Sequence, residues 1–397
     1  MKNLLFILSV ILVWVFSLVN TSGLGLAYDT PTKTNIVICL WCLTLILSGK
    51  DILLKVFKAN SQLVRFTVLS FVIFPLLIAS SWEGFTYLMM VPLVYCFSEQ
   101  KVTAWAMNIS GYAVAGLGLF ILYVFKNTGI LSGWNYNHIS MIGLFSYIYY
   151  SISLYGNMSG RKLTIGVAIS LLYIMMLSSM DSRSSIIFIM LSVLFAYKGD
   201  WFRWLLKKKR FVFFALNVPI IISLICILFP NLFIFQYFGE WSMENFGKSA
   251  MNGRDRLWLE AYKELFDSYL LGEGEFLINY HNSGVAVLSV FGVIGYICWY
   301  KILAKPMQFI RLYASDSLML GFISSFLLIF WQQSFELGFV NASPNMIPYM
   351  ILGLGIARAR GIRQRQQHRT KSLHLVNEQP PFIEPFYLFD KNSDGKG

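Results

Sequence analysis

Apolar runs long enough to cross a membrane recur along the whole chain, and no other feature limits the possible folds as strongly. The runs are about 17 to 25 residues long, the length that a helix needs to cross a hydrocarbon core of roughly 30 Å. Lipid offers no hydrogen-bond partners, so the backbone of each run must satisfy itself as a helix. Only 13% of the residues are charged, against about 25% in soluble domains, so we predict an all-α, polytopic membrane bundle.

The runs predict about twelve transmembrane helices. No small-x-small cleavage site follows the first run, so we interpret that run as a retained helix rather than a signal peptide. The predicted spans are 4–20, 34–48, 63–81, 84–98, 102–125, 139–156, 163–180, 184–198, 211–230, 282–304, 317–335 and 343–357.

The distribution of charge predicts how the bundle is oriented. With the N-terminus in the cytoplasm, the cytoplasmic segments hold 25 of the 32 Lys and Arg residues, and the external segments hold 7. The net charge is then +17 inside and −5 outside, which is the bias of a bacterial inner-membrane protein with both termini in the cytoplasm. The excess of basic residues therefore reports membrane orientation and gives no argument for a nucleic-acid partner.

The predicted transmembrane bundle comprises residues 1–357, and two polar segments stand out along the chain, one within the bundle and one after it. The tail 358–397 begins with a basic run, and we expect it to be a largely disordered cytoplasmic extension that contacts anionic membrane lipids. Residues 231–281 form a large external loop between the ninth and tenth spans, on the periplasmic side. Within this loop, the apolar residues of 254–269 recur at helical spacing, which predicts an amphipathic helix. We expect this helix to lie along the membrane surface or over the bundle, where it is either a moving lid or a structural cap. Its predicted apolar stripe is Leu257, Trp258, Ala261, Tyr262, Leu265, Phe266 and Tyr269.

Several common catalytic motifs are absent from the sequence. The chain has no Asp-x-Asp pair for a metal–sugar-diphosphate, no cysteine–histidine cluster for zinc and no G-x-S-x-G nucleophile elbow. The Gly247-Lys248-Ser249 sequence resembles the end of a P-loop, but Ser242 stands where the first glycine is needed. We therefore expect neither a metal nor a cofactor.

The candidate functional residues are external arginines, a histidine and its neighbour. Arg183 lies at the external junction of the seventh and eighth spans, where a charged group normally has a partner or a role. Arg254 and Arg256 open the amphipathic helix, where guanidinium groups and the helix N-terminus hold anions well. His281 and Asn282 stand where the chain re-enters the membrane. Together these residues suit binding of a lipid diphosphate while a base activates a hydroxyl.

Structural roles are open alternatives for each of these residues. Arg183 has Asp181 nearby as a partner, and the two would cap the bundle. Arg256 has Glu260 at helical i,i+4 spacing. A histidine before a transmembrane helix also occurs without any function, so His281 alone decides nothing.

Around these residues the sequence resembles the O-antigen polymerase and O-antigen ligase superfamily. The order and external placement of five short motifs carry the resemblance. The motifs are Ser182-Arg183, Asn252-Gly253-Arg254-Asp255-Arg256-Leu257-Trp258, Leu271-Gly272-Glu273-Gly274, His281-Asn282-Ser283 and Gly292-Val293-Ile294-Gly295.

The resemblance implies a metal-independent, inverting glycosyltransferase that acts on undecaprenyl-diphosphate-linked glycans at the periplasmic face. It implies that His281 is the general base or orients the acceptor hydroxyl, and that Arg183 and Arg254 bind the diphosphate. Arg256 and Asn282 are weaker matches for the same role. The chemistry agrees with the residues, because an imidazole exchanges protons near neutral pH and arginines stabilise a departing diphosphate.

The acceptor separates the two activities of this superfamily. A polymerase extends another undecaprenyl-linked repeat unit, with a chain-length regulator as a further partner, whereas a ligase transfers the glycan to lipid A-core. We favour the polymerase, because nothing in the sequence marks a site for a core oligosaccharide.

Two other classes of function are alternatives. A transporter or flippase suits twelve helices, but such carriers usually have related halves, a central cytoplasmic loop and ionisable groups at mid-membrane. Here the long loop is external and late, and the span centres lack ionisable residues. A purely structural role would leave the external arginines and His281 unexplained.

Overall fold

The computed structural model is all-helical within the residues it describes, which are 2–21, 94, 97, 98, 100–127, 136–155, 160–180, 182–247, 251, 253–274, 280–336 and 345–376. None of these residues forms a β-strand. The helices are α1 (Lys2–Thr21), α8 (Ala104–Asn127), α9 (Tyr136–Ser151), α10 (Gly160–Ser178), α11 (Arg183–Tyr197), α12 (Gly199–Lys207), α13 (Phe211–Leu228), α14 (Phe233–Phe246), α15 (Arg254–Asp267), α16 (Ser283–Ile310), the 3₁₀ turn η1 (Arg311–Tyr313), α17 (Ser317–Gln332) and α18 (Ile347–Val376).

The apolar helices support the prediction that this is a membrane protein. In the described part of the chain, α8, α13 and α16 with its η1 extension are long and apolar enough to cross a membrane. The α11–α12 pair, bent by 88°, makes a fourth candidate. Nine predicted spans coincide with helices, whereas 34–48, 63–81 and nearly all of 84–98 lie outside the described residues. The count of twelve spans stays a prediction.

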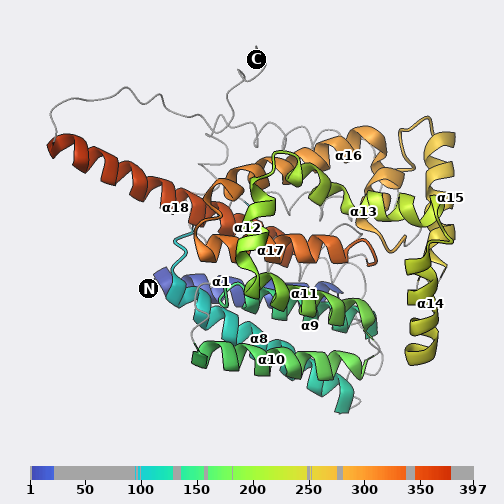
Figure 1. The fold of residues 1–397 in the computed structure, drawn as a ribbon, viewed down its shortest axis with the longest axis horizontal. Coiled ribbons are helices and arrows are strands. Elements are labelled where there is room, and N and C mark those ends of the chain that lie inside the picture. The colour runs from blue at the N-terminus through green and yellow to red at the C-terminus, as the bar shows by residue number, and fades with distance from the viewer. Residues whose placement is uncertain are drawn as a thin grey trace.

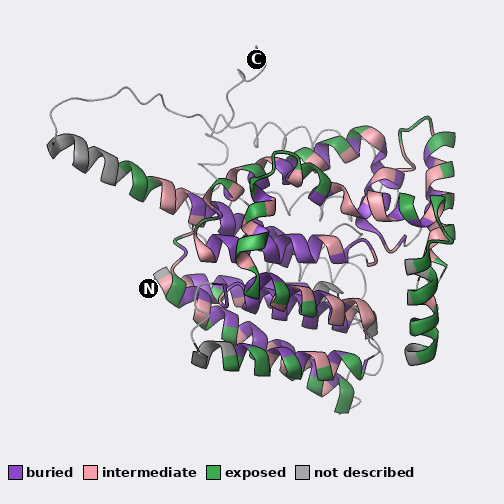
Figure 2. Cartoon of the chain, in the orientation of Figure 1, coloured by how far each residue is buried: buried purple, intermediate pink, exposed green. Residues whose placement is uncertain are grey.

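Two helices, α9 and α17, form the interior of the bundle. Nearly every side chain of α17 is buried, and α9 is buried from Ile139 to its end at Ser151 (Figure 2). Helices α8, α10, α11 and α17 pack around α9, while α18, α11 and α13 pack against α17. A helix that is apolar on all sides belongs in such an interior, so the sequence of α17 accounts for its central place.

Small residues let these helices approach closely. A Cβ atom on Gly118 would lie 2.4 Å from the hydroxyl of Tyr173, and one on Gly321 would lie 2.8 Å from the carbonyl of Ile152. The Tyr173 hydroxyl donates a hydrogen bond of 2.8 Å to the Ala115 carbonyl. Close backbone approach and such bonds between helices are the main source of helix association in lipid, where the hydrophobic effect contributes little.

The two ends of the bundle differ in character (Figure 1). One end carries α12, η1 and a basic cluster in which Arg358 pairs with Asp316 at 2.7 Å and Arg311 donates to the Lys208 carbonyl at 3.1 Å. The opposite end carries α14 and α15, and α14 runs across the direction of α9, α11 and α17. Both α14 and α15 lie in the predicted loop 231–281.

The predicted amphipathic helix is confirmed as α15, but its stripe is shorter than expected. Trp258, Ala261 and Leu265 are buried against the bundle. Phe266 and Tyr269, which we predicted on the same stripe, are exposed to 70% and 88%. The helix ends before Tyr269, which adopts a φ of 54° and turns the chain away from the helical direction.

Helix α18 extends further than the sequence suggested. We predicted a largely disordered tail from residue 358, whereas α18 continues through Val376. The segment 358–376 contains no proline and is rich in arginine and glutamine, which favour a helix. The rest of the predicted tail, 377–397, lies outside the described residues.

A break in α16 gives the loop a place to dock. Gly292 leaves the helical conformation, with φ 65° and ψ −170°, and so frees backbone groups on both sides. The chain after α15 takes them up: the Val293 amide donates to the Leu270 carbonyl at 3.0 Å, and the Gly274 amide donates to the Val290 carbonyl at 2.9 Å. The turn after α15 is therefore held to α16 at this break by backbone hydrogen bonds.

We predict that Gly292→Ala lowers the melting temperature of the purified protein by roughly 5–10 °C. An added Cβ would lie 2.3 Å from the Leu270 carbonyl oxygen, and the residue would keep a positive φ. Thermal unfolding followed by tryptophan fluorescence measures the change. Gly239→Ala in α14 is the control, because a Cβ there meets nothing within 4 Å. Equal melting temperatures for the two variants would contradict this account of the break.

Candidate functional site

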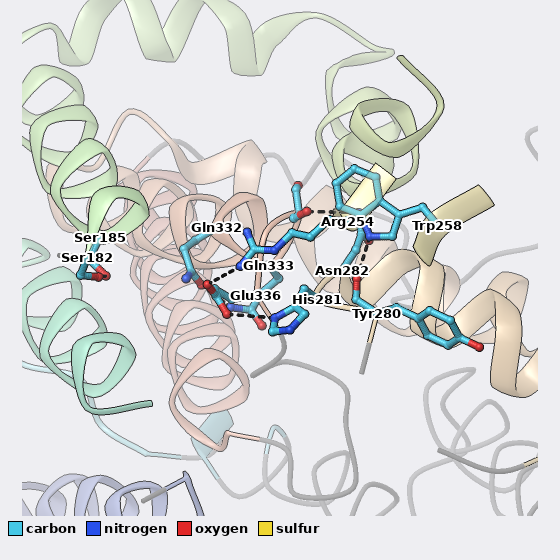
Figure 3. A network of polar contacts seen from close by, with 11 residues as sticks. Ser182, Ser185, Arg254, Trp258, Tyr280, His281, Asn282, Gln332, Gln333 and Glu336 are labelled. Atoms are coloured by element: carbon cyan, nitrogen blue, oxygen red, sulfur yellow. Dashed lines mark hydrogen bonds and ion pairs between the residues drawn. The ribbon is translucent and has the colours of Figure 1, made fainter. Parts of the chain in front are cut away.

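Arg254 and His281 meet at a residue that sequence analysis did not identify, Glu336. Arg254 donates to Oε1 of Glu336 at 3.1 Å, and Nδ1 of His281 lies 3.5 Å from Oε2 of the same carboxylate. Figure 3 shows both side chains directed toward Glu336. The side chains of Arg254 and Glu336 are each 16% exposed, and that of His281 is 30% exposed. The site therefore combines a cation, a carboxylate and an imidazole in largely buried surroundings.

Bonds between the start of α16 and the end of α17 bring His281 beside Glu336. The Ser283 amide donates to the Gln333 carbonyl at 2.9 Å, and Nδ2 of Asn282 donates to the Ser334 carbonyl at 3.3 Å. These two links join the residues that directly follow His281 to the residues that shortly precede Glu336. Residues 55 positions apart in the sequence thus share one site.

Asn282 is fully buried and its side-chain amide is used by the fold. Its Oδ1 accepts from the amides of Gly284 and Val285 at 2.9 and 3.1 Å, which caps α16. Its Nδ2 also donates to the Pro219 carbonyl at 2.8 Å, which links α16 to α13. These contacts give Asn282 a structural role, and its predicted contact with a diphosphate stays a prediction.

A second anchor holds the other side of His281. The indole Nε1 of Trp258 donates to the Tyr280 carbonyl at 2.7 Å, and both residues are buried. Trp258 lies one helical turn after Arg254 on α15, so the same bond positions Arg254. His281 itself has a φ of 50°, in the left-handed region that non-glycine residues rarely occupy. Its backbone is fixed between Tyr280 and Asn282, which determines where the imidazole points.

Arg183 is the first residue of α11, and its guanidinium contacts the Ser242 hydroxyl of α14. This contact joins the bundle to the helix that crosses its end. Arg183 therefore lies at the end of the bundle that carries α14 and α15 (Figure 1), and its predicted contact with a diphosphate stays a prediction. Its alternative partner, Asp181, lies outside the described residues.

Arg256 is placed differently from Arg254, although both lie in the first turn of α15. Its side chain is 84% exposed and pairs with Glu260 at 3.2 Å. Exposed i,i+4 pairs contribute only a few tenths of a kcal/mol. The structure thus shows the helix ion pair that was the alternative for Arg256.

The sequence contains a weak signal for Glu336. Glu336 directly follows the apolar predicted span 317–335, in the short segment before the last predicted span, and it is the one acidic residue in that segment. A lone carboxylate after Gln332 and Gln333 at the end of a buried helix is expensive unless it has a partner. The sequence alone does not say that the partners are Arg254 and His281.

A second polar cluster surrounds the hydroxyl group of Tyr280, the residue that precedes His281. The Tyr280 hydroxyl donates to Glu264 of α15 at 3.0 Å and accepts from Ser289 of α16 at 2.9 Å. Burial, together with a hydrogen bond and charge repulsion from Glu264, raises the pKa of Glu273 to about 7. The two carboxyls share this contact favourably only while one of them is protonated.

No group of three or more His, Cys, Asp or Glu side chains is arranged for a metal ion in the described part of the chain. What the site offers is a guanidinium for an anion and an imidazole for a proton, with a carboxylate in contact with both.

The comparisons with known proteins identify no family, because no family model, no curated protein and no solved structure matches the chain. The resemblance to the O-antigen polymerase and ligase superfamily therefore stays a prediction from short motifs.

We predict that the protein becomes less stable as the pH rises from about 4.5 to about 7. In the unfolded chain Glu273 loses its proton near its ordinary pKa of 4.5, whereas in the folded protein its pKa is about 7. The folded state binds more protons in this range, so its stability falls with rising pH, by about 1 kcal/mol once solvent screening is allowed for.

Melting temperatures measured from pH 4.5 to 8 test this prediction. Glu273→Gln should flatten the dependence on pH, while Glu244→Gln on the exposed surface of α14 should leave it unchanged. An unchanged slope in Glu273→Gln would assign the dependence to other groups.

Proposed function

We propose that this protein is an inner-membrane glycosyltransferase that polymerises undecaprenyl-diphosphate-linked repeat units at the periplasmic face. The observation that carries the proposal is the meeting of Arg254 and His281 at Glu336, at the end of an apolar helical bundle. These are the residues that the sequence motifs assign to diphosphate binding and to the general base.

Arg254 supports the diphosphate half of the proposal. Its largely buried guanidinium faces the site, where weak solvent screening strengthens its attraction for an anion. Arg183 contributes a second cation from α11 at the same end of the bundle. Charge that develops on the leaving diphosphate is stabilised by such prearranged donors, which is a large term in catalysis.

His281 supports the proton-transfer half. Nδ1 faces Glu336, so Nε2 is the nitrogen that takes the proton from the acceptor hydroxyl. The acceptor oxygen then forms a bond to the anomeric carbon from the side opposite the diphosphate. The bond between that carbon and the diphosphate oxygen breaks, and its electron pair leaves with undecaprenyl diphosphate. One bond forms, one breaks, and the configuration is inverted.

The placement of charge supports the periplasmic side. The basic residues of α12, η1 and α18 lie at the end of the bundle opposite α14 and α15 (Figure 1). Under the positive-inside rule that end faces the cytoplasm, and the site then faces the periplasm.

Reporter fusions test this orientation. We predict that alkaline phosphatase fused after residue 249 is active and that the same reporter fused after residue 209 is inactive, because it folds only outside the cytoplasm. The reverse pattern would place the site in the cytosol and end the proposal.

An assay with purified protein tests the reaction itself. The protein is incubated with an undecaprenyl-diphosphate-linked repeat unit in EDTA, without nucleotide. We expect chain growth. Transfer only to added lipid A-core would assign the chain to the ligase reaction instead. Neither product, with glycan uptake by proteoliposomes, would show a transporter and overturn the proposal.

In the same assay, His281→Ala should lower the rate about 10²- to 10⁴-fold and Arg254→Ala about 10²- to 10³-fold. Arg256→Ala is the matched control, because its exposed side chain pairs with Glu260 alone among the contacts described, and we expect its rate within about twofold of wild type. Melting temperatures show whether each variant is folded. A rate near wild type in folded His281→Ala would remove the imidazole from catalysis.

A further inference from the structure

Glu336 divides one carboxylate between two cationic or potentially cationic groups. Oε1 accepts from Arg254, and Oε2 faces Nδ1 of His281 (Figure 3). The carboxylate is 16% exposed, so its interactions are screened less than those of the surface pair Arg256–Glu260. The way in which this carboxylate is shared between Arg254 and His281 therefore affects the free energy of the site.

A bound diphosphate changes that distribution. The diphosphate and Glu336 are both negative, and both are ligands for the same guanidinium. A diphosphate bound to Arg254 would lie close to Glu336, and like charges that lie close together repel each other strongly in a poorly hydrated site. The Arg254 guanidinium therefore pairs with Glu336 when the site is empty, and binds the diphosphate when the site is filled.

The carboxylate of Glu336 is able to change its partner without any movement of the backbone. The backbone of His281 is fixed by Trp258 on one side and by the buried Asn282 on the other. The backbone at Arg254 is held by the docking of α15 through Trp258. Glu336 lies past the last residue of α17, and its side chain has three rotatable bonds. A rotation of this side chain is enough to exchange its partners.

We propose that Glu336 is a positioning residue that occupies Arg254 in the empty site and transfers to His281 when a diphosphate binds. The proposal rests on the proposed function. Once released, the whole carboxylate accepts from Nδ1–H, fixes the tautomer with Nε2 as base, and stabilises the imidazolium that forms. The base thus becomes fully oriented only when the donor diphosphate is in place.

Competition for Arg254 has a measurable consequence. Glu336→Gln removes the negative charge but keeps the shape, so inorganic pyrophosphate should bind about five- to tenfold more tightly than to wild type. The turnover number should fall on the order of 100-fold, because a neutral amide does not stabilise an imidazolium. Both KM and kcat should therefore decrease. Structural damage would instead raise KM.

Isothermal titration of the purified full chain with inorganic pyrophosphate measures binding, and the glycan assay measures turnover. Glu260→Gln is the matched control, because it removes the carboxylate partner of the other arginine in the first turn of α15. We expect wild-type binding and turnover from it. Glu336→Asp, which keeps the charge, should bind pyrophosphate like wild type and recover part of the turnover. It also gives a readout if Glu336→Gln is unstable.

The outcomes separate this inference from the proposed function. Pyrophosphate binding to Glu336→Gln that is equal to or weaker than wild type would overturn the exchange of partners. Tighter binding with unchanged turnover would also overturn it, because His281 would not depend on the carboxylate. If wild type binds no pyrophosphate and makes no polymer, the proposed function itself fails.

Discussion

The buried side chain of Asn282 holds together the part of the structure on which the site depends. Its oxygen caps α16, and its nitrogen binds carbonyls that belong to α13 and to the end of α17. A buried carbonyl left without a partner costs about 1–3 kcal/mol, so these contacts favour one arrangement of the three helices. That arrangement sets the neighbouring His281 beside Glu336. A residue that the motifs suggested as a ligand contact is thus the one that positions the imidazole.

The docking of α15 completes the site, and it explains why two neighbouring arginines differ. Trp258 is buried and bound to the Tyr280 carbonyl, so the face of α15 that carries it is turned toward the bundle. Arg254 lies one turn earlier on that face and reaches Glu336. Arg256 lies on the outer face and is 84% exposed. Burial, rather than residue type, decides which guanidinium is able to act on an anion in a poorly hydrated site.

The sequence predicted the features that depend on local pattern. The apolar runs predicted the helices, and the stripe around Trp258 predicted α15, because helical periodicity is visible within a dozen residues. The sequence did not predict α14, the break at Gly292 or the role of Glu336. The break depends on backbone partners supplied by the turn after α15, and Glu336 has its partners 82 and 55 residues away. Such features arise from tertiary packing, which no local period records.

The loop that we predict to be external raises one electrostatic problem, because residues 231–281 carry eight acidic and four basic side chains. An anion would not be drawn to the loop as a whole. Several of these carboxyls have local partners in the structure. Glu260 is paired with Arg256, and Glu264 accepts a hydrogen bond from the Tyr280 hydroxyl. Burial beside Glu264 raises the pKa of Glu273 to about 7. With these charges paired or neutralised, they oppose an anion at Arg254 less than the formal count suggests. Glu336 is then the one described carboxylate in direct contact with Arg254. Under the exchange that we propose, anion binding depends on that single side chain rather than on the charge of the surface.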